Sequence, residues 1–262
     1  MCLRALVAKK MKMKFKHTGF SLVEVLMAVG ILTVGLLLVA TMFPAAIYMT
    51  TVASERTMAA IVADGAFAKI QIYDVNGITS TLNDPCNCYD WGDGMEAASS
   101  IDVNEFSYPP VDPNGGSSQY FWSALYRKTD NNSDSAEYQI TVFVARRMNS
   151  GLTYESGSVA AGYSGGNTWP MLMELDATGS QDSLTLNING DDEKLVNPSV
   201  TIVDNATGKL YAVVKRGEDN DDKKITLDRP LESAVTSIWL IPPPESGGKN
   251  AGVEVYQRII KF

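Results

Sequence analysis

The chain has 262 residues, 45% of them hydrophobic, so one sizeable domain or two small ones can be built around a buried core. The formal net charge is -8, and a surface with an acidic excess disfavours non-specific nucleic-acid binding. The single histidine, His17, lies in a short N-terminal segment, which leaves the rest of the chain without Ser-His-Asp or Cys-His catalysis or a histidine-ligated zinc site.

The first 19 residues are basic and are followed by a long apolar run. The six basic residues of this segment, with no acidic residue among them, are Arg4, Lys9, Lys10, Lys12, Lys14 and Lys16. The run from Phe20 to Tyr48 is long enough to cross a bilayer core of about 30 Å, for which roughly 20 residues suffice. Because Lys and Arg near a span tend to stay on the cytoplasmic side, most of the chain is expected on the opposite side.

Two residues at the start of the apolar run are unusual. Glu24 is acidic, and an intramembrane carboxylate costs on the order of a few kcal/mol, so it points to a function. Gly19 is a small residue that comes before the apolar core, whereas an ordinary secretory signal has its small-residue cleavage site after the core.

This arrangement resembles the leader of type IV pilins and type II secretion pseudopilins, over roughly residues 10 to 50. The resemblance implies that residues 1–19 are a leader and that a prepilin peptidase cuts between Gly19 and Phe20 and methylates the new amine. Glu24, the fifth residue of the mature chain, would then be the assembly carboxylate. The implied partners are the peptidase, other pilin or pseudopilin subunits and an inner-membrane assembly platform.

Simple electrostatics agrees with this role for Glu24. Cleavage would leave a charged amine at Phe20, and Glu24 lies about 6 Å further along a helix of about 1.5 Å rise per residue. A charge in apolar surroundings is tolerated when it is paired. In the family the amine belongs to the neighbouring subunit, which would make Glu24 a register device for polymerisation. The alternative is a plain signal anchor in which Glu24 reaches the lipid headgroups.

Residues 20–76 are predicted to form one long helix, with a transmembrane part over about 20–48 and an end at Asn76-Gly77. Pro44 removes a backbone hydrogen bond and is expected to kink or loosen the helix. In the second half, apolar residues recur at three- or four-residue spacing, which predicts a face that packs on a sheet. These residues are Met58, Val62, Ala66, Ile70 and Tyr73.

Residues 77–262 are predicted to form an extracytoplasmic β-rich domain, with a further sub-domain over about 180–262. Alternating residues predict an antiparallel hairpin of residues 120–127 and 138–147. Later strands are predicted at 171–175, 183–188, 200–203, 210–215, 224–227, 237–241 and 253–260. The strands from 195 to 231 either close into a small barrel or extend the first sheet. The predicted fold class is therefore α+β and pilin-like: a long N-terminal helix packed on an antiparallel β-sheet, with an additional β-rich C-terminal region.

Two thiols, Cys86 and Cys88, remain after the leader, and a strained local bridge, a bridge between subunits and free thiols all stay open.

Cation binding is a weaker hypothesis. Pseudopilins of the major type can hold calcium in a late loop, so by resemblance the weak candidate ligands are Asp219, Asp221 and Asp222, with a solvated hairpin tip as the alternative. No other cofactor is expected.

The sequence as a whole favours a structural subunit over an enzyme. By resemblance it is a minor pilin or pseudopilin of a type IV pilus or type II secretion filament. It would span the bacterial inner membrane once, with a cytoplasmic N-terminus and a periplasmic domain, before it enters a periplasmic or extracellular filament. The alternative is a membrane-anchored extracytoplasmic binding or adhesion domain with a plain signal anchor.

Overall fold

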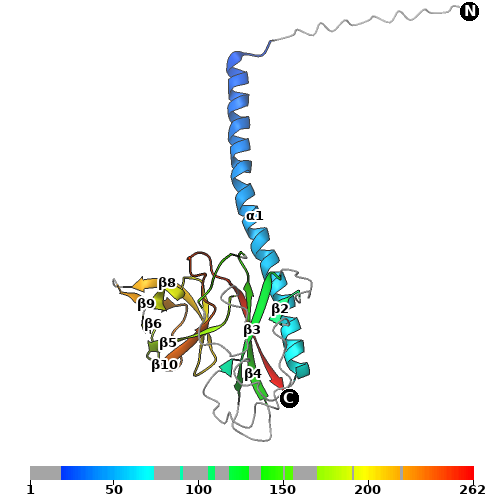
Figure 1. The fold of residues 1–262 in the computed structure, drawn as a ribbon. Helices are drawn as coiled ribbons and strands as arrows, with labels where there is room; N and C mark the ends of the chain where they lie inside the picture. The colour runs from blue at the N-terminus through cyan, green and yellow to red at the C-terminus, as the bar shows by residue number, and fades with distance from the viewer. Residues whose placement is uncertain are drawn as a thin grey trace, which may run out of the picture. The chain divides into compact units, whose positions relative to one another are not determined.

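The computed structural model describes residues 19–73, 89–90, 106–109, 118–129, 137–149, 151–155, 170–190, 192–218 and 221–262 (Figure 1). The described elements are a long helix α1 (Leu22–Tyr73), a short 3-10 helix η3 (Asp192–Leu195) and eleven strands. The chain divides into two compact units, Met1–Val52 and Ala53–Phe262, and the division falls inside α1. The predicted α+β class with a long N-terminal helix is confirmed.

Helix α1 is 52 residues long and continues through Pro44, although this residue has no backbone N–H to donate. In the first unit every helical residue up to Thr51 is exposed, and most of these residues are large and apolar. A helix that is apolar on all sides is typical of a membrane span or of a buried position in an assembly.

The part of α1 that begins at Ala53 is amphipathic and packs on a sheet. Its buried residues follow the three- and four-residue spacing of one helix face. They are Ala59, Val62, Ala63, Ala66, Phe67 and Ile70. The predicted face is largely correct, since it contains Val62, Ala66 and Ile70, but it missed the neighbouring row with Phe67. Met58 is only partly buried, and the side chain of Tyr73 lies outside the described set.

The first sheet is antiparallel, with strands in the order β1-β3-β4-β11, and β2 pairs with β3. Its strands are β1 (Tyr89–Asp90), β2 (Ser107–Tyr108), β3 (Tyr120–Lys128), β4 (Glu137–Arg146) and β11 (Gly252–Lys261). The predicted hairpin is confirmed as β3 and β4, with Tyr120 opposite Arg146. Along β4, Ile140, Val142 and Val144 are in the core that contains α1, while Phe143 and Ala145 are in a second core on the other face.

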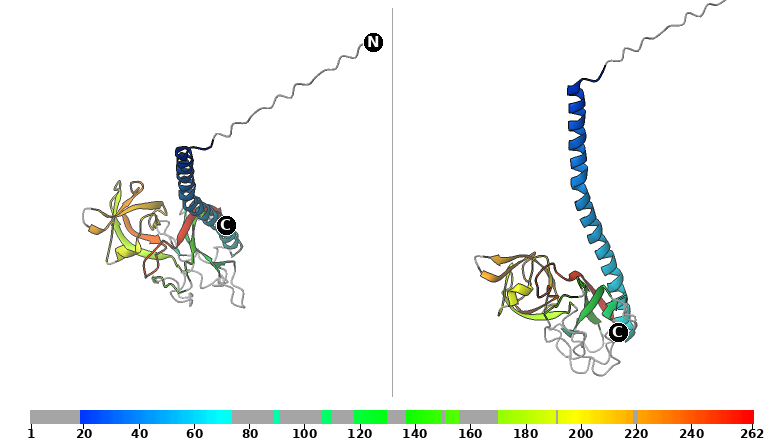
Figure 2. Two further views of the ribbon diagram at one scale, coloured as in Figure 1. Left: turned by 90° about the horizontal axis from the view of Figure 1, so that it is seen from above. Right: turned by 45° about the horizontal axis from the view of Figure 1, so that its top comes forward.

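Six strands form a closed antiparallel barrel in the order β10-β5-β6-β9-β8-β7 (Figure 2). They are β5 (Met173–Gly179), β6 (Thr185–Ile188), β7 (Thr201–Asp204), β8 (Leu210–Glu218), β9 (Asp221–Leu227) and β10 (Val235–Leu240). Of the two arrangements left open for residues 195–231, the structure has the barrel. The barrel strands run from residue 173 to 240, while β11 belongs to the first sheet and pairs with β4.

The barrel and the part of α1 that begins at Ala53 cover opposite faces of the first sheet, as both views in Figure 2 show. The core on the barrel side contains Leu125 and Phe143 from the sheet and Val203, Trp239 and Ile241 from the barrel and its last connection. Since β4 is buried on both faces, its sequence reads as a nearly continuous apolar run from Ile140 to Ala145.

Ionisation of Tyr256 on β11 is expected to lower the stability of the domain at alkaline pH. Burial, reinforced by the nearby charges of Glu254 and Asp64 and opposed by Arg56, raises its pKa above the ordinary value of 10.0. Above about pH 10 the unfolded chain loses this proton first, so stability falls as pH rises from there through the folded-state pKa. We expect Tyr256→Phe to lose less stability between about pH 8 and about pH 11 than the wild type, measured by urea unfolding. An equal loss in both proteins would contradict the assignment.

Candidate assembly and processing site

The predicted cleavage pair lies just before α1. Gly19 and Phe20 precede the first helical residue, both are exposed, and the Phe20 side chain is 80% exposed. A Cβ atom placed on Gly19 would meet no other atom within 4 Å. In the described part of the chain this peptide bond is therefore open to an approaching peptidase.

Glu24 lies in the first turn of α1. The backbone N–H groups of Glu24 and Val25 both donate to the carbonyl oxygen of Ser21, at 2.9 and 3.2 Å, which fixes the start of the helix. The positive end of the helix dipole favours a carboxylate at this position. Among the described residues no side chain forms an ion pair or hydrogen bond with this carboxylate, and the next charged residue in the sequence is Glu55.

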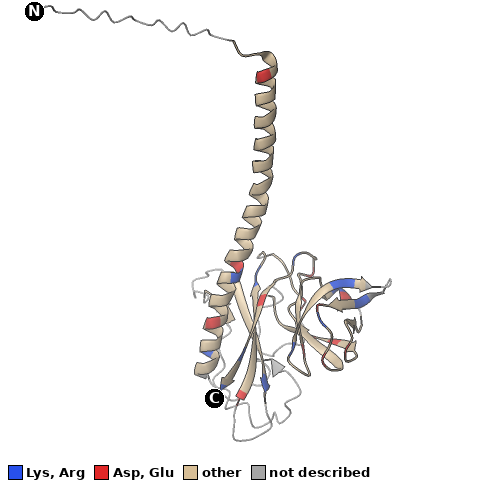
Figure 3. Cartoon of the chain, turned by 180° about the vertical axis from the view of Figure 1, so that it is seen from behind, with Lys and Arg blue, Asp and Glu red and all other residues tan. Residues whose placement is uncertain are grey.

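The threonine hydroxyl groups of the apolar half are satisfied within the helix. The hydroxyl groups of Thr33, Thr41 and Thr50 each donate at 2.8 Å to a backbone carbonyl three or four residues earlier. Such bonds leave the threonines able to enter apolar surroundings without losing a partner. In Figure 3 the first half of α1 carries charge only in its first turn.

One segment of α1, Leu22–Ile72, contains a stretch long and apolar enough to cross a membrane. The most apolar 18-residue window has a mean hydropathy of 2.6, and none of that window is buried in the structure. Together with the basic residues before it, the helix fits a membrane-anchored single-pass protein.

Residues 14–40 match the family model described as "Prokaryotic N-terminal methylation motif". The chain carries the type IV pilin and pseudopilin signature. The match spans Gly19, Phe20 and Glu24, and the motif implies processing by prepilin peptidase and assembly with other pilin subunits. No curated protein and no solved structure matches the chain. The individual roles of the three residues stay predictions.

The calcium hypothesis also stays a prediction. Asp219 lies outside the described residues, as do Cys86 and Cys88, and the side chains of Asp221 and Asp222 at the start of β9 are not described. Among the described residues no group of three or more His, Cys, Asp or Glu side chains is close enough to hold a metal ion.

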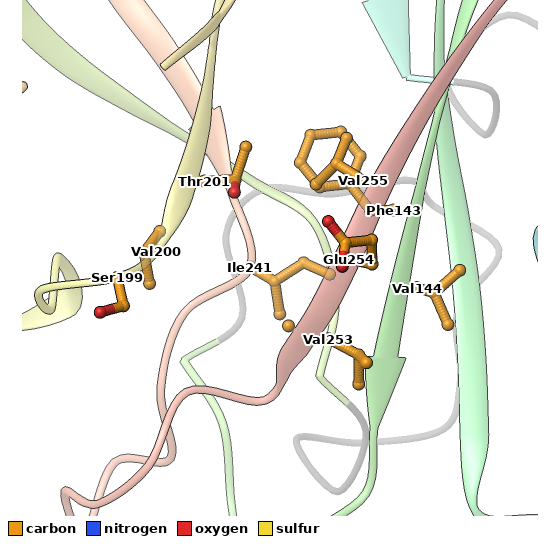
Figure 4. Close-up of a pocket in the computed structure, with 10 residues that line it drawn as sticks. Phe143, Val144, Ser199, Val200, Thr201, Ile241, Val253, Glu254 and Val255 are labelled. Atoms are coloured by element: carbon orange, nitrogen blue, oxygen red, sulfur yellow. The ribbon is translucent and has the colours of Figure 1, made fainter. Parts of the chain in front are cut away.

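A small pocket lies beside β11, between the first sheet and the barrel (Figure 4). Its volume is about 40 Å³, and the residues that line it include Phe143, Val200, Ile241, Val255 and the charged Glu254. Ligand sites for small molecules usually measure about 300–1,000 Å³, so this pocket has room for a few water molecules only. The start of α1 is therefore the candidate site, and this pocket is not.

Proposed function

We propose that this protein is a structural subunit of a type IV pilus or type II secretion filament, and within that class a minor subunit. The observation that carries the proposal is the methylation motif at residues 14–40, placed at the start of a helix whose apolar half is exposed on all sides. The partners would be prepilin peptidase, other pilin or pseudopilin subunits and an inner-membrane assembly platform.

The physical logic of assembly follows from the exposed helix. In the membrane its apolar side chains are covered by lipid, and in a filament the same side chains would be covered by the helices of other subunits. Moving these side chains from lipid to the filament interior would cost little free energy because both surroundings are apolar. The charged amine freed at Phe20 would pair with the Glu24 carboxylate of a neighbouring subunit, so two charges enter an apolar interior as a pair.

The size of the second unit supports a minor rather than a major role. In addition to the helix and sheet of the first core, the domain contains a six-stranded barrel with its own core. A barrel of this kind is extra surface for contacts at the tip or side of a filament. The domain would lie in the periplasm before assembly, with the leader in the cytoplasm.

The test is the chemistry of the N-terminus. The full chain is expressed with and without prepilin peptidase, and the purified protein is analysed by mass spectrometry. We expect a mature chain that begins at Phe20 with a methylated amine only when the peptidase is present. An intact leader in both preparations would overturn the proposal and select the alternative, a binding or adhesion domain held by a plain signal anchor.

A further inference from the structure

In the first turn of α1 in the second unit, from Ala53 to Met58, Met58 alone packs against the core that the helix shares with the sheet, and it is only partly buried. The residues of this turn are exposed or only partly buried, and the fully buried face of the helix begins at Ala59. Apolar burial therefore holds the helix from Met58 to Ile70, and the core contains no residue of the turn before Met58.

Ion pairs connect this turn to the sheet and to the connection before β11. The Glu55 side chain is only 14% exposed, contacts Nη1 of Arg146 and lies 3.7 Å from Nζ of Lys249. Next to it, Nε of Arg56 lies 3.6 Å from the Oε2 atom of Glu254. Figure 3 shows charged residues of both signs on α1 where its second unit begins.

The groups that face Glu55 are themselves fixed. Arg146 is the last residue of β4, and its backbone N–H donates to the carbonyl of Ala251 at 2.8 Å. Lys249 is in the connection that leads to β11, where the side chain of Asn250 donates to the carbonyl of Pro198 at 3.1 Å. The sheet and its connection therefore position Arg146 and Lys249 independently of the helix turn.

We propose that the contact between Glu55 and Arg146 is a clamp that holds the first domain turn of α1 on the sheet, with Lys249 and the more exposed Arg56–Glu254 pair at its edge, and that loss of Glu55 releases it. The low exposure of Glu55 strengthens its attraction to the two cations. The Nε atom of Arg146 is buried without a hydrogen-bond partner, so loss of Glu55 would leave this guanidinium still less satisfied. This inference concerns the domain alone and does not depend on the proposed function.

The far end of the helix offers an internal comparison. Asp64 and Arg258 form an ion pair at 2.5 Å, but both side chains are more than half exposed, and such pairs contribute little. Phe67 and Ile70, which are buried in the sheet core, hold the helix there. Loss of one ion pair is therefore expected to affect the first turn and not this end.

The test measures distances by pulsed electron paramagnetic resonance on the full chain in detergent, with all three cysteines, Cys2, Cys86 and Cys88, replaced by serine. One pair of spin labels is placed at the exposed positions Thr57 and Ile259, and a second at Ile72 and Ile259. We expect Glu55→Gln to broaden the distance distribution of the first pair at least about twofold, because the turn is no longer held to the sheet. About 1 M salt lowers the Debye length to about 3 Å and should broaden the wild-type distribution less than Glu55→Gln does, because a partly buried pair is screened less than an exposed one.

The second label pair and one further variant are the controls. The distance distribution between positions 72 and 259 should stay narrow in every protein and at every salt concentration. Asp64→Asn, which removes the exposed pair, should leave both distributions unchanged. An unchanged distribution for positions 57 and 259 in Glu55→Gln would overturn the clamp, and equal broadening of both label pairs would show a loosened domain instead.

Discussion

Glu24→Ala is expected to reduce incorporation of the protein into filaments by a factor on the order of 10² to 10³. The reason is that the amine of the neighbouring Phe20 would enter an apolar interior without its counter-charge. Removing one partner of a buried ion pair typically costs about 3–5 kcal/mol, and each 1.4 kcal/mol is about tenfold in affinity. The measurement is the ratio of subunit in sheared filaments to subunit in membranes, with the other subunits and the assembly machinery present.

Two matched variants separate charge from polarity. Glu24→Gln keeps the shape of the side chain but not its charge, so it should assemble as poorly as the alanine variant. Thr33→Ala removes a polar group of the same helix whose hydroxyl bonds only to the backbone of Gly30, and it should assemble normally. Membrane insertion and leader cleavage should be intact in all three variants. Normal assembly of Glu24→Ala would contradict the role assigned to the carboxylate.

The long helix and the position of most strands could be predicted from the sequence because both depend on local patterns. An apolar run longer than a bilayer crossing needs no tertiary information, and alternation with period two marked β3 and β4 within one or two residues of their ends. The predicted helix face omitted Ala63 and Phe67, which are buried. These two residues fit the three- and four-residue spacing as well as Val62 and Ala66 do.

Long-range pairing could not be predicted. Nothing local in Tyr138 and Ile260 shows that they are opposite each other in the sheet, with a whole barrel between them in the chain. For the same reason the contact between Glu55 and Arg146, 91 residues apart, could not be found from the sequence. Local charge patterns on a helix report neighbours three or four residues away and no others.

The candidate site could be predicted from the sequence because its residues lie close together in the chain. Gly19, Phe20 and Glu24 form a short motif, and the family match over residues 14–40 covers all three. The partner of Glu24 could not be predicted in this way. In the proposed filament it belongs to another copy or another subunit, and one chain alone contains no pattern that specifies that contact.

Asp204→Ala is expected to destabilise the domain by about 2–4 kcal/mol, because a buried acceptor of several hydrogen bonds is lost. The Asp204 side chain is 1% exposed and accepts from the backbone N–H groups of Ala206 and Thr207, at 3.1 and 3.2 Å. These bonds shape the turn between β7 and β8, where Gly208 has a φ of 68° that glycine adopts without strain. For a domain of this size we expect a fall in Tm of roughly 5–15 °C, measured by calorimetry.

The same turn joins the barrel to the first sheet, so the effect should reach beyond the turn itself. The carbonyl of Gly208 accepts from the side-chain amides of Gln139 and Gln257, at 3.2 and 2.7 Å, and both residues lie on the sheet. Asp176→Ala is the matched control, because it removes an equally charged but exposed side chain from the barrel strand β5 and should change stability by less than about 0.5 kcal/mol. Asp204→Asn keeps one acceptor oxygen and should fall between the two. If Asp204→Ala and Asp176→Ala have equal Tm values, the turn does not stabilise the junction of barrel and sheet.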